Sequence, residues 1–504
     1  MQTVHAVLLP SGRILLASGS SWRNLGPIQT FPTTNPPPTP QGIFNRGLDP
    51  FANSKLSWYY QLVNNTAVYN PEKNTFFRIP SPVPQADPNE PNHFVPSDLF
   101  CTGEHHLPNG DVLVAGGTQY YYPYRTGQNS TYIFDWKKEL GIAWDHVDWR
   151  QLPSDATNPW TFAGFMKRGR WYPSMLPLLD GRFAVFGGYV GFDKGFQDMY
   201  KFQLNHYVEF FDPKAWSKAD PQKAWKAIDV HELPNSPFVT LINPNFDPRN
   251  CAAGPTYDAC VQTNKYDNFK LYPENYLMPD GNILLSREGD WVSLRTEDTA
   301  FMRRTKHTYF ARIEGTRDNP SISFKPGPDR PEDVTSYGTS LLDPNTGLVT
   351  ILGGQPTSAG TLFPFNSTPY QISAMPYQFA GGRGSHKRET FHPSAPEPNG
   401  GHWTLEPDFL GTEPQDDRTM HYALTLPTRQ ILIINGGNYD FYGAVYYPLL
   451  LTPLFRNGTF SSYTKERMSE GMQPRLYHNV ALLMPDARVW VSGGNSTRAT
   501  VYST

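Results

Sequence analysis

The chain has 504 residues and a formal net charge of -3 at pH 7, with 41 Gly, 49 Pro and 14% aromatic residues. It lacks the basic runs of a nucleic-acid-binding surface and any apolar run near the ~20 residues of a membrane-spanning helix, which excludes both kinds of partner. This composition is typical of a β-rich protein with many turns, and the expected partners are small neutral molecules.

One pattern recurs along the chain: an apolar strand, a turn of the Pro-Asp-Gly kind, a second strand and usually a Gly-Gly doublet. Its seven copies begin at Val4, Glu104, Tyr172, Glu274, Tyr337, His421 and His478. Gly or Asn between strands rich in Val, Ile and Leu indicates β-hairpins, because these residues accept positive φ at little cost. Such a repeat predicts an all-β, seven-bladed β-propeller of kelch type with four antiparallel strands per blade.

We expect residues 1–504 to form a single propeller whose blades start near residues 4, 101, 172, 272, 337, 420 and 477. The copies average 72 residues, above the roughly 50 of a kelch repeat, so the surplus should form inserted loops such as the Pro-rich stretch from Thr30. The first strand starts close to Met1 and the last ends at Thr504. We therefore expect a chain trimmed at both ends, without its signal peptide or a C-terminal domain, and what completes the seventh blade stays open.

The three cysteines divide by spacing. Cys251 and Cys260 bracket a short Gly-Pro loop that a disulfide would close, as is expected in an oxidising compartment, whereas Cys101 is left alone. Sequons for N-glycosylation begin at Asn64, Asn129, Asn366, Asn457 and Asn495. Together these features favour a secreted or extracellular protein.

Three motifs resemble a known family. They are FCTGEHHLPNG around Cys101, GRWYP around Tyr172 and PRLYHNVALLMPDARVWVSGG around Tyr477 and His478, and their order and spacing are similar to those of the copper radical oxidases, the galactose oxidase and glyoxal oxidase group. The resemblance implies a thioether between Cys101 and Tyr172, with Tyr172 as copper ligand and radical site. It also implies that Tyr477 is the axial tyrosine that accepts the substrate proton, and that His478 is an imidazole ligand.

These residue types suit the implied reaction, in which a primary alcohol or aldehyde and O2 give an aldehyde or acid and H2O2. The substrate loses two electrons, so a copper ion that takes one of them needs a second one-electron acceptor beside it. A thioether-substituted phenol is easier to oxidise than an ordinary phenol, and a bound cation stabilises its phenolate form. Mixed nitrogen and oxygen ligation is also typical of Cu(II) sites.

The chain departs from the family pattern where a second histidine ligand should follow the last Gly-Gly doublet, because residues 495–498 read Asn-Ser-Thr-Arg. Either another residue or water would then complete the copper coordination, or the site has lost its metal. The candidate replacements are His5 and His421, with His105 and His106 less favoured. The tryptophan that covers the thioether in galactose oxidase is also missing, which leaves Tyr189 or Phe192 as the cover and Gln355 as a candidate substrate contact on the rim.

Each of these residues also has a structural interpretation. Cys101 could be a small buried apolar side chain, Tyr172 could pack as a core aromatic residue, and His478 could cap a strand. A second function is therefore a non-catalytic kelch propeller that has lost a copper ligand and binds a glycan or a protein, since a fold by itself does not determine function. The sequence favours the oxidase and leaves open whether the substrate is an alcohol, an aldehyde or a carbohydrate.

Overall fold

The computed structural model describes residues 3–18, 66–83, 85–86, 94–95, 98–120, 126–149, 153–192, 202–238, 272–286, 290–296, 299–303, 307–331, 334–356, 384–394, 400–438 and 443–494. This part of the chain is all-β, as predicted. Its helices are short, namely α4 (Trp136–Leu140), η1 (Trp144–His146), η3 (Pro221–Ala224) and η5 (Pro414–Asp416). Within these ranges no helix has the length and apolar character needed to cross a membrane.

Each of the seven sequence copies forms an antiparallel hairpin. In chain order the hairpins are β1 (His5–Leu8) with β2 (Ile14–Ala17), β7 (Asp98–His106) with β8 (Val112–Tyr120), β10 (Trp160–Pro177) with β11 (Phe183–Phe192), β15 (Glu274–Leu277) with β16 (Asn282–Ser286), β22 (Thr339–Leu342) with β23 (Val349–Leu352), β27 (Tyr422–Thr425) with β28 (Ile431–Ile434), and β31 (Asn479–Leu483) with β32 (Val489–Gly493). The predicted hairpins are therefore confirmed.

Further strands extend most hairpins outward. They are β3 (Thr66–Asn70), β4 (Thr75–Ile79), β9 (Thr126–Phe134), β13 (Tyr207–Phe211), β14 (Trp225–Asp229), β19 (Tyr309–Gly315), β20 (Pro320–Pro326), β25 (Arg388–Pro393), β26 (Gly401–Glu406), β29 (Leu449–Arg456) and β30 (Thr459–Arg467). Short additional strands are β5 (Gln85–Ala86), β6 (Phe94–Val95), β12 (Phe202–Leu204), β17 (Asp290–Thr296), β18 (Thr299–Arg303), β21 (Val334–Ser336) and β24 (Gln355–Pro356).

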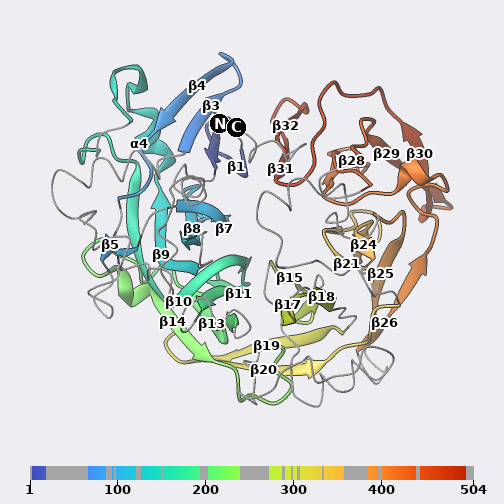
Figure 1. The fold of residues 1–504 in the computed structure, drawn as a ribbon, viewed down its shortest axis with the longest axis horizontal. Helices are drawn as coiled ribbons and strands as arrows, with labels where there is room; N and C mark the ends of the chain where they lie inside the picture. Colours follow the sequence, from blue (N-terminus) through green and yellow to red (C-terminus); the bar gives the residue numbers. More distant parts are fainter. Residues whose placement is uncertain are drawn as a thin grey trace.

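The sheets follow one another around a ring in chain order (Figure 1). Four of them have four strands each, in the orders β1-β2-β3-β4, β15-β16-β19-β20, β22-β23-β25-β26 and β27-β28-β29-β30. The second and third copies share one larger sheet, because the long strand β10 pairs with β9 through its first half and with β11 through its second half. The described part of the seventh copy is the pair β31-β32.

One backbone feature recurs at the inner end of the hairpins. Six residues there have positive φ, between 43° and 65°, although none of them is Gly: Cys101, Tyr172, Tyr272, Tyr337, Met420 and His478. Each stands six positions before the residue whose N–H closes the hairpin turn, these being Leu107, Leu178, Met278, Asp343, Leu426 and Met484. A left-handed conformation at a bulky residue costs about 1–3 kcal/mol and persists only where the surroundings enforce it. The repeat therefore imposes the same turn on six different side chains.

The Gly-Gly doublets of the second, fifth and seventh copies lie where neighbouring copies meet. A Cβ atom at Gly116 would come within 2.4 Å of the Arg170 carbonyl oxygen, and one at Gly353 within 2.5 Å of the Arg418 oxygen. The last doublet packs in the same way against the first copy, since a Cβ at Gly493 would lie 2.2 Å from the Thr3 oxygen. These doublets serve close packing, and the last of them joins the two ends of the ring.

The apolar core lies between neighbouring sheets rather than at one centre. Leu15 and Val68 of the first sheet pack with Val114, Phe134 and Trp160 of the next. A second cluster brings Ile14 and Leu16 together with Met484, and so connects the first and seventh copies. Full burial of a side chain such as Leu or Phe stabilises the fold by about 1.5–3 kcal/mol, so each copy depends on both of its neighbours.

Candidate functional site

Tyr172 is positioned by a buried ion pair two residues before it. Arg170 and Glu209 are almost completely buried, and Arg170 Nη2 lies 2.7 Å from Glu209 Oε2. The same guanidinium donates to the carbonyl oxygen of Gly187 and, at 2.8 Å, to that of Tyr207. These bonds fix the strand just before the left-handed residue and so hold the Tyr172 ring at the inner end of its copy.

Cys101 and Tyr172 pack in one cluster. The Cys101 thiol is completely buried, Tyr172 is 8% exposed, and both belong to one apolar cluster with Phe100 and Trp171. Burial raises the pKa of Tyr172 well above its usual range, with smaller contributions from Cys101 and Tyr477, and the Cys101 side chain hydrogen-bonds to the phenol. The tyrosine is therefore a neutral phenol in contact with a thiol.

Tyr477 and His478 of the seventh copy complete this group. The Tyr477 and Tyr172 hydroxyl oxygens are 2.7 Å apart and share a hydrogen bond. The Tyr477 ring lies 3.7 Å from the His478 ring, and His478 makes an edge contact with Phe100 at 5.0 Å. The thiol, both phenols and the imidazole therefore come together from three copies. We call these four residues the tyrosine cluster.

Two further tyrosines border the cluster and were missed in the sequence analysis. The Tyr272 N–H donates to the Tyr172 carbonyl oxygen at 2.7 Å, and the two rings meet edge to face at 4.8 Å. The Tyr337 ring lies 6.3 Å from that of Tyr477. Tyr272 shares the offset of six residues from the turn with Cys101 and Tyr172, and this offset is the signal that could have identified it.

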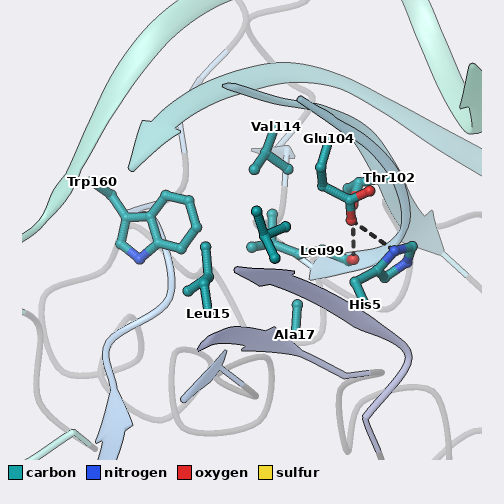
Figure 2. A pocket seen from close by; sticks show the side chains of 9 residues that line it. His5, Leu15, Ala17, Leu99, Thr102, Glu104, Val114 and Trp160 are labelled. Atoms are coloured by element: carbon teal, nitrogen blue, oxygen red, sulfur yellow. Dashed lines mark hydrogen bonds and ion pairs between the residues drawn. The ribbon is translucent and has the colours of Figure 1, made fainter. Parts of the chain in front are cut away.

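A polar network supports Cys101 from the first copy. The Cys101 N–H donates to His5 Nε2 at 2.9 Å, while His5 Nδ1 lies 2.7 Å from Glu104 Oε1. Thr102 donates to the same carboxylate oxygen at 2.7 Å, and Figure 2 shows the three side chains at one end of a small pocket. Apolar side chains such as Leu15, Val114 and Trp160 line the rest of that pocket. Both ring nitrogens of His5 are therefore already engaged.

His421, the other candidate replacement ligand, has a different environment. It is 4% exposed, and neither ring nitrogen has a hydrogen-bond partner among the described residues. Burial, together with the positive charge of Arg418, lowers the pKa of His421 to about 3, so the ring is neutral. Its ring packs against Gly353 of the fifth copy, and no hydrogen bond or ring contact in the described part of the chain joins it to Tyr172 or Tyr477.

The less favoured histidines point away from the tyrosine cluster. His106 Nε2 lies 2.7 Å from the Leu8 carbonyl oxygen, and the His105 ring lies 5.2 Å from that of Phe183. The predicted cover residues Tyr189 and Phe192 belong to β11, where the backbone of Tyr189 pairs with Trp171, and Gln355 begins β24. The structure does not describe the side chains of these three residues. Also outside the described residues are positions 495–498 and the proposed disulfide cysteines Cys251 and Cys260.

Known proteins resemble this chain in sequence and in fold. The family model "Glyoxal oxidase N-terminus" matches residues 403–504. The curated "Aldehyde oxidase GLOX" of Vitis pseudoreticulata is 25% identical over 411 residues, which cover 79% of this chain and 56% of that protein. The chain thus spans little more than half the length of this relative.

A solved structure is similar over nearly the whole chain. It is a fungal alcohol oxidase of the AA5 family in complex with copper, and it is 17% identical with a TM-score of 0.53. The match covers 99% of this chain and 72% of that protein. At this level of identity the likeness concerns the fold.

Proposed function

We propose that this chain oxidises a primary alcohol or aldehyde with O2, giving an aldehyde or acid and H2O2. The proposal rests on its resemblance to the copper radical oxidases. The observation that carries the proposal is the 2.7 Å hydroxyl contact between Tyr172 and Tyr477, with the Cys101 thiol against the same phenol. A purely structural contact between two phenols would not require a thiol and an imidazole beside it. The names of the aldehyde and alcohol oxidases among its relatives support the reaction class.

The proposed architecture is a single seven-bladed kelch propeller over residues 1–504, with blades starting near residues 4, 101, 172, 272, 337, 420 and 477. It is supported by the seven hairpins, by the four-stranded sheets, and by the packing of the last Gly-Gly doublet against Thr3. Strand β10 would belong to two blades, with its first half closing the second blade and its second half opening the third.

The residues present fit a copper ion. Tyr172, Tyr477 and His478 would hold it through two phenol oxygens and one imidazole nitrogen, a donor set that suits Cu(II). His421 is the better of the two candidate replacements for the fourth ligand, because its buried ring nitrogens make no hydrogen bond to any residue that the structure describes, whereas both nitrogens of His5 are engaged. Bound copper would supply a one-electron acceptor and a cation that stabilises phenolate.

The side chains would divide the reaction between them. Tyr477 would take the proton of the substrate hydroxyl group, which for an aldehyde belongs to the hydrate that it forms with water. Tyr172, bonded through an ortho carbon to the Cys101 sulfur, would accept one electron. Burial of Cys101 and Tyr172 keeps water from the oxidised ring. The substrate loses two electrons and two protons, and O2 takes up both pairs to form H2O2. Formation of the thioether itself removes two hydrogens from the side chains, with O2 as the oxidant.

Peptide mass spectrometry after copper treatment in air tests the proposal. We expect the Cys101 and Tyr172 peptides to appear as one reduction-resistant species about 2 Da lighter than their sum, since the thioether replaces an S–H and a ring C–H bond. Cys101→Ser is the control and should leave the peptides separate. A peroxide assay over primary alcohols and aldehydes would then identify the substrate. Separate, alkylatable peptides and no peroxide from the copper-treated protein would contradict the proposal.

The second candidate, a non-catalytic propeller that binds a glycan or protein, is favoured by residues 495–498, which offer no imidazole where the family places its second histidine. It predicts no tight copper binding even after reconstitution, which equilibrium dialysis would measure. Secretion also remains part of the proposal. Asn457 is exposed at the turn between β29 and β30, so a glycosidase-sensitive mass increase at this sequon in a secreting host would support it.

A further inference from the structure

A second group of candidate metal ligands lies at the outer edge of the third copy. His206 directly precedes β13, Asp229 is the last residue of β14, and His231 follows two residues later. Tyr207 and Asp229 are partners in the β13–β14 register, and the Val230 N–H donates to the His206 carbonyl oxygen at 2.9 Å. The paired backbone therefore holds the three residues close to one another. We call them the rim triad.

The three side chains converge on one point. The Nδ1 atoms of His206 and His231 lie 2.7 Å and 2.6 Å from the same carboxylate oxygen, Asp229 Oδ1. Each residue offers one ligand atom, and these atoms all lie within 4.8 Å of one another. The side chain of His206 is 11% exposed, whereas those of Asp229 and His231 are 39% and 38% exposed. The group therefore has one buried wall and one side open to solvent.

Hydrogen bonding from both rings to one carboxylate oxygen is possible, because that oxygen has two lone pairs, and the same arrangement also presents three metal-ligand atoms side by side. With both Nδ1 atoms protonated, two N–H groups share a single carboxylate oxygen, and the imidazole rings approach edge to face at 5.0 Å. If both rings carried charge they would repel each other at this separation. A metal ion held between these three ligand atoms would instead be bound by the lone pairs of both nitrogens and by the carboxylate. The Tyr207 hydroxyl, which also bonds to Asp229, would orient that ligand from outside.

We propose that His206, Asp229 and His231 bind a divalent transition-metal ion, with water completing the coordination. Two imidazole nitrogens and one carboxylate oxygen are a donor set of proteins that hold Zn²⁺ in four-coordinate sites. The same donors accept Cu²⁺, so the ion is chosen by availability as well as by geometry. The bound ion would fasten the segment after β14 onto β13. This site shares no residue with the tyrosine cluster.

Zinc titration of the metal-stripped full chain tests the proposal. Zn²⁺ is the probe because it takes no part in redox chemistry, and calorimetry with elemental analysis gives its affinity and stoichiometry. We expect His231→Ala to lose one equivalent of bound Zn²⁺ relative to the unmodified chain, or to bind it about 100-fold more weakly, since even outer-shell changes cost 10–100-fold. Asp229→Asn should show a similar loss, which guards against a local folding defect in the first variant.

The matched control is His307→Ala. The Nδ1 atom of His307 lies 2.7 Å from Asp329 Oδ1, so this pair has the same contact as each arm of the rim triad but does not belong to a metal-ligand group in the described part of the chain. We expect it to keep the full zinc stoichiometry. Zn²⁺ should also raise the melting temperature of the unmodified chain and of the control, but not that of His231→Ala. Equal zinc stoichiometry and affinity in His231→Ala and the unmodified chain would overturn the proposal.

Discussion

The tyrosine cluster and the rim triad both gather imidazole and oxygen donors, but they differ in burial. Cys101 is completely buried and Tyr172 is 8% exposed, whereas the Asp229 side chain at the rim is 39% exposed. Two histidines show the effect on protonation. Burial lowers the pKa of His421 to about 3, while hydrogen bonding to Asp229 raises the pKa of His231. Burial therefore favours the neutral form of His421, and it also lowers the pKa of His206 in the rim triad, whereas the contact with Asp229 favours the charged form of His231.

The two regions are also connected. Arg170, which positions Tyr172, binds Glu209 and the Tyr207 carbonyl oxygen, and both of these belong to β13, the strand that His206 precedes. A change in one region could therefore affect the other through this strand. Substitutions in the tyrosine cluster, at Arg170 and in the rim triad would therefore separate the contributions to catalysis, stability and metal binding.

The largest expected effect follows from Tyr172→Phe. Without the hydroxyl group the ring can neither bind copper nor act as the electron acceptor, so peroxide production should fall at least about a thousandfold, as when a member of a catalytic unit is removed. Zinc binding at the rim should stay unchanged. Tyr272→Phe is the matched control, because it removes only the hydrogen bond to the Thr102 carbonyl oxygen and should cost less than about tenfold. Equal losses in both variants would show that Tyr172 has no special role.

The next effect is structural. Arg170→Met leaves the Glu209 carboxylate buried without its cation and should lower the free energy of unfolding by about 3–5 kcal/mol. Arg418→Met is the control, since Arg418 is equally buried but donates to the carbonyl oxygens of Asn435 and Tyr447, so its loss should cost only about 1–3 kcal/mol. Urea unfolding of both variants would measure the difference. A smaller loss for Arg170→Met than for the control would contradict the proposed importance of the ion pair.

A pH-dependent effect is expected at His421. Between its unfolded pKa near 6.5 and its folded pKa of about 3, the unfolded chain binds a proton that the native chain does not, so stability falls as pH falls. From pH 7 to pH 5 this contributes a loss of about 2 kcal/mol in the copper-free protein. The free energy of unfolding of His421→Leu should therefore fall by about 2 kcal/mol less over the same pH range. This variant should also bind copper more weakly. Parallel stability curves for the two proteins would show that the buried imidazole is not responsible.

The smallest effect on oxidation is expected at the rim. His231→Ala should lose the bound zinc yet change peroxide production by less than about twofold, because the rim triad contributes no residue to the tyrosine cluster. The peroxide assay on zinc-free and zinc-loaded protein measures this directly. A loss of turnover comparable to that of Tyr172→Phe would mean that the two regions act as one site through β13.

The sequence predicted part of the candidate site from short motifs. Cys101, Tyr172, Tyr477 and His478 stand in strings with few alternatives, and the structure brings them together. Tyr272 stands near the expected start of the fourth blade but was not named as a site residue, because no motif marks it and only its backbone position matches that of Tyr172. The rim triad has no motif of its own. His206 and Asp229 are 23 positions apart in the chain, and only the β13–β14 register places them together.

The sequence by itself determined the repeat: its turn residues and apolar strands are local signals, and they require only short-range backbone geometry to form seven hairpins. Tertiary structure decided which side chains meet and which are charged. The contacts of Cys101, Tyr172 and Tyr477 cross between copies up to 305 positions apart, and the lowered pKa of His421 depends on burial by the rest of the fold. Burial and electrostatic interaction arise from packing between distant segments, so no local pattern encodes them.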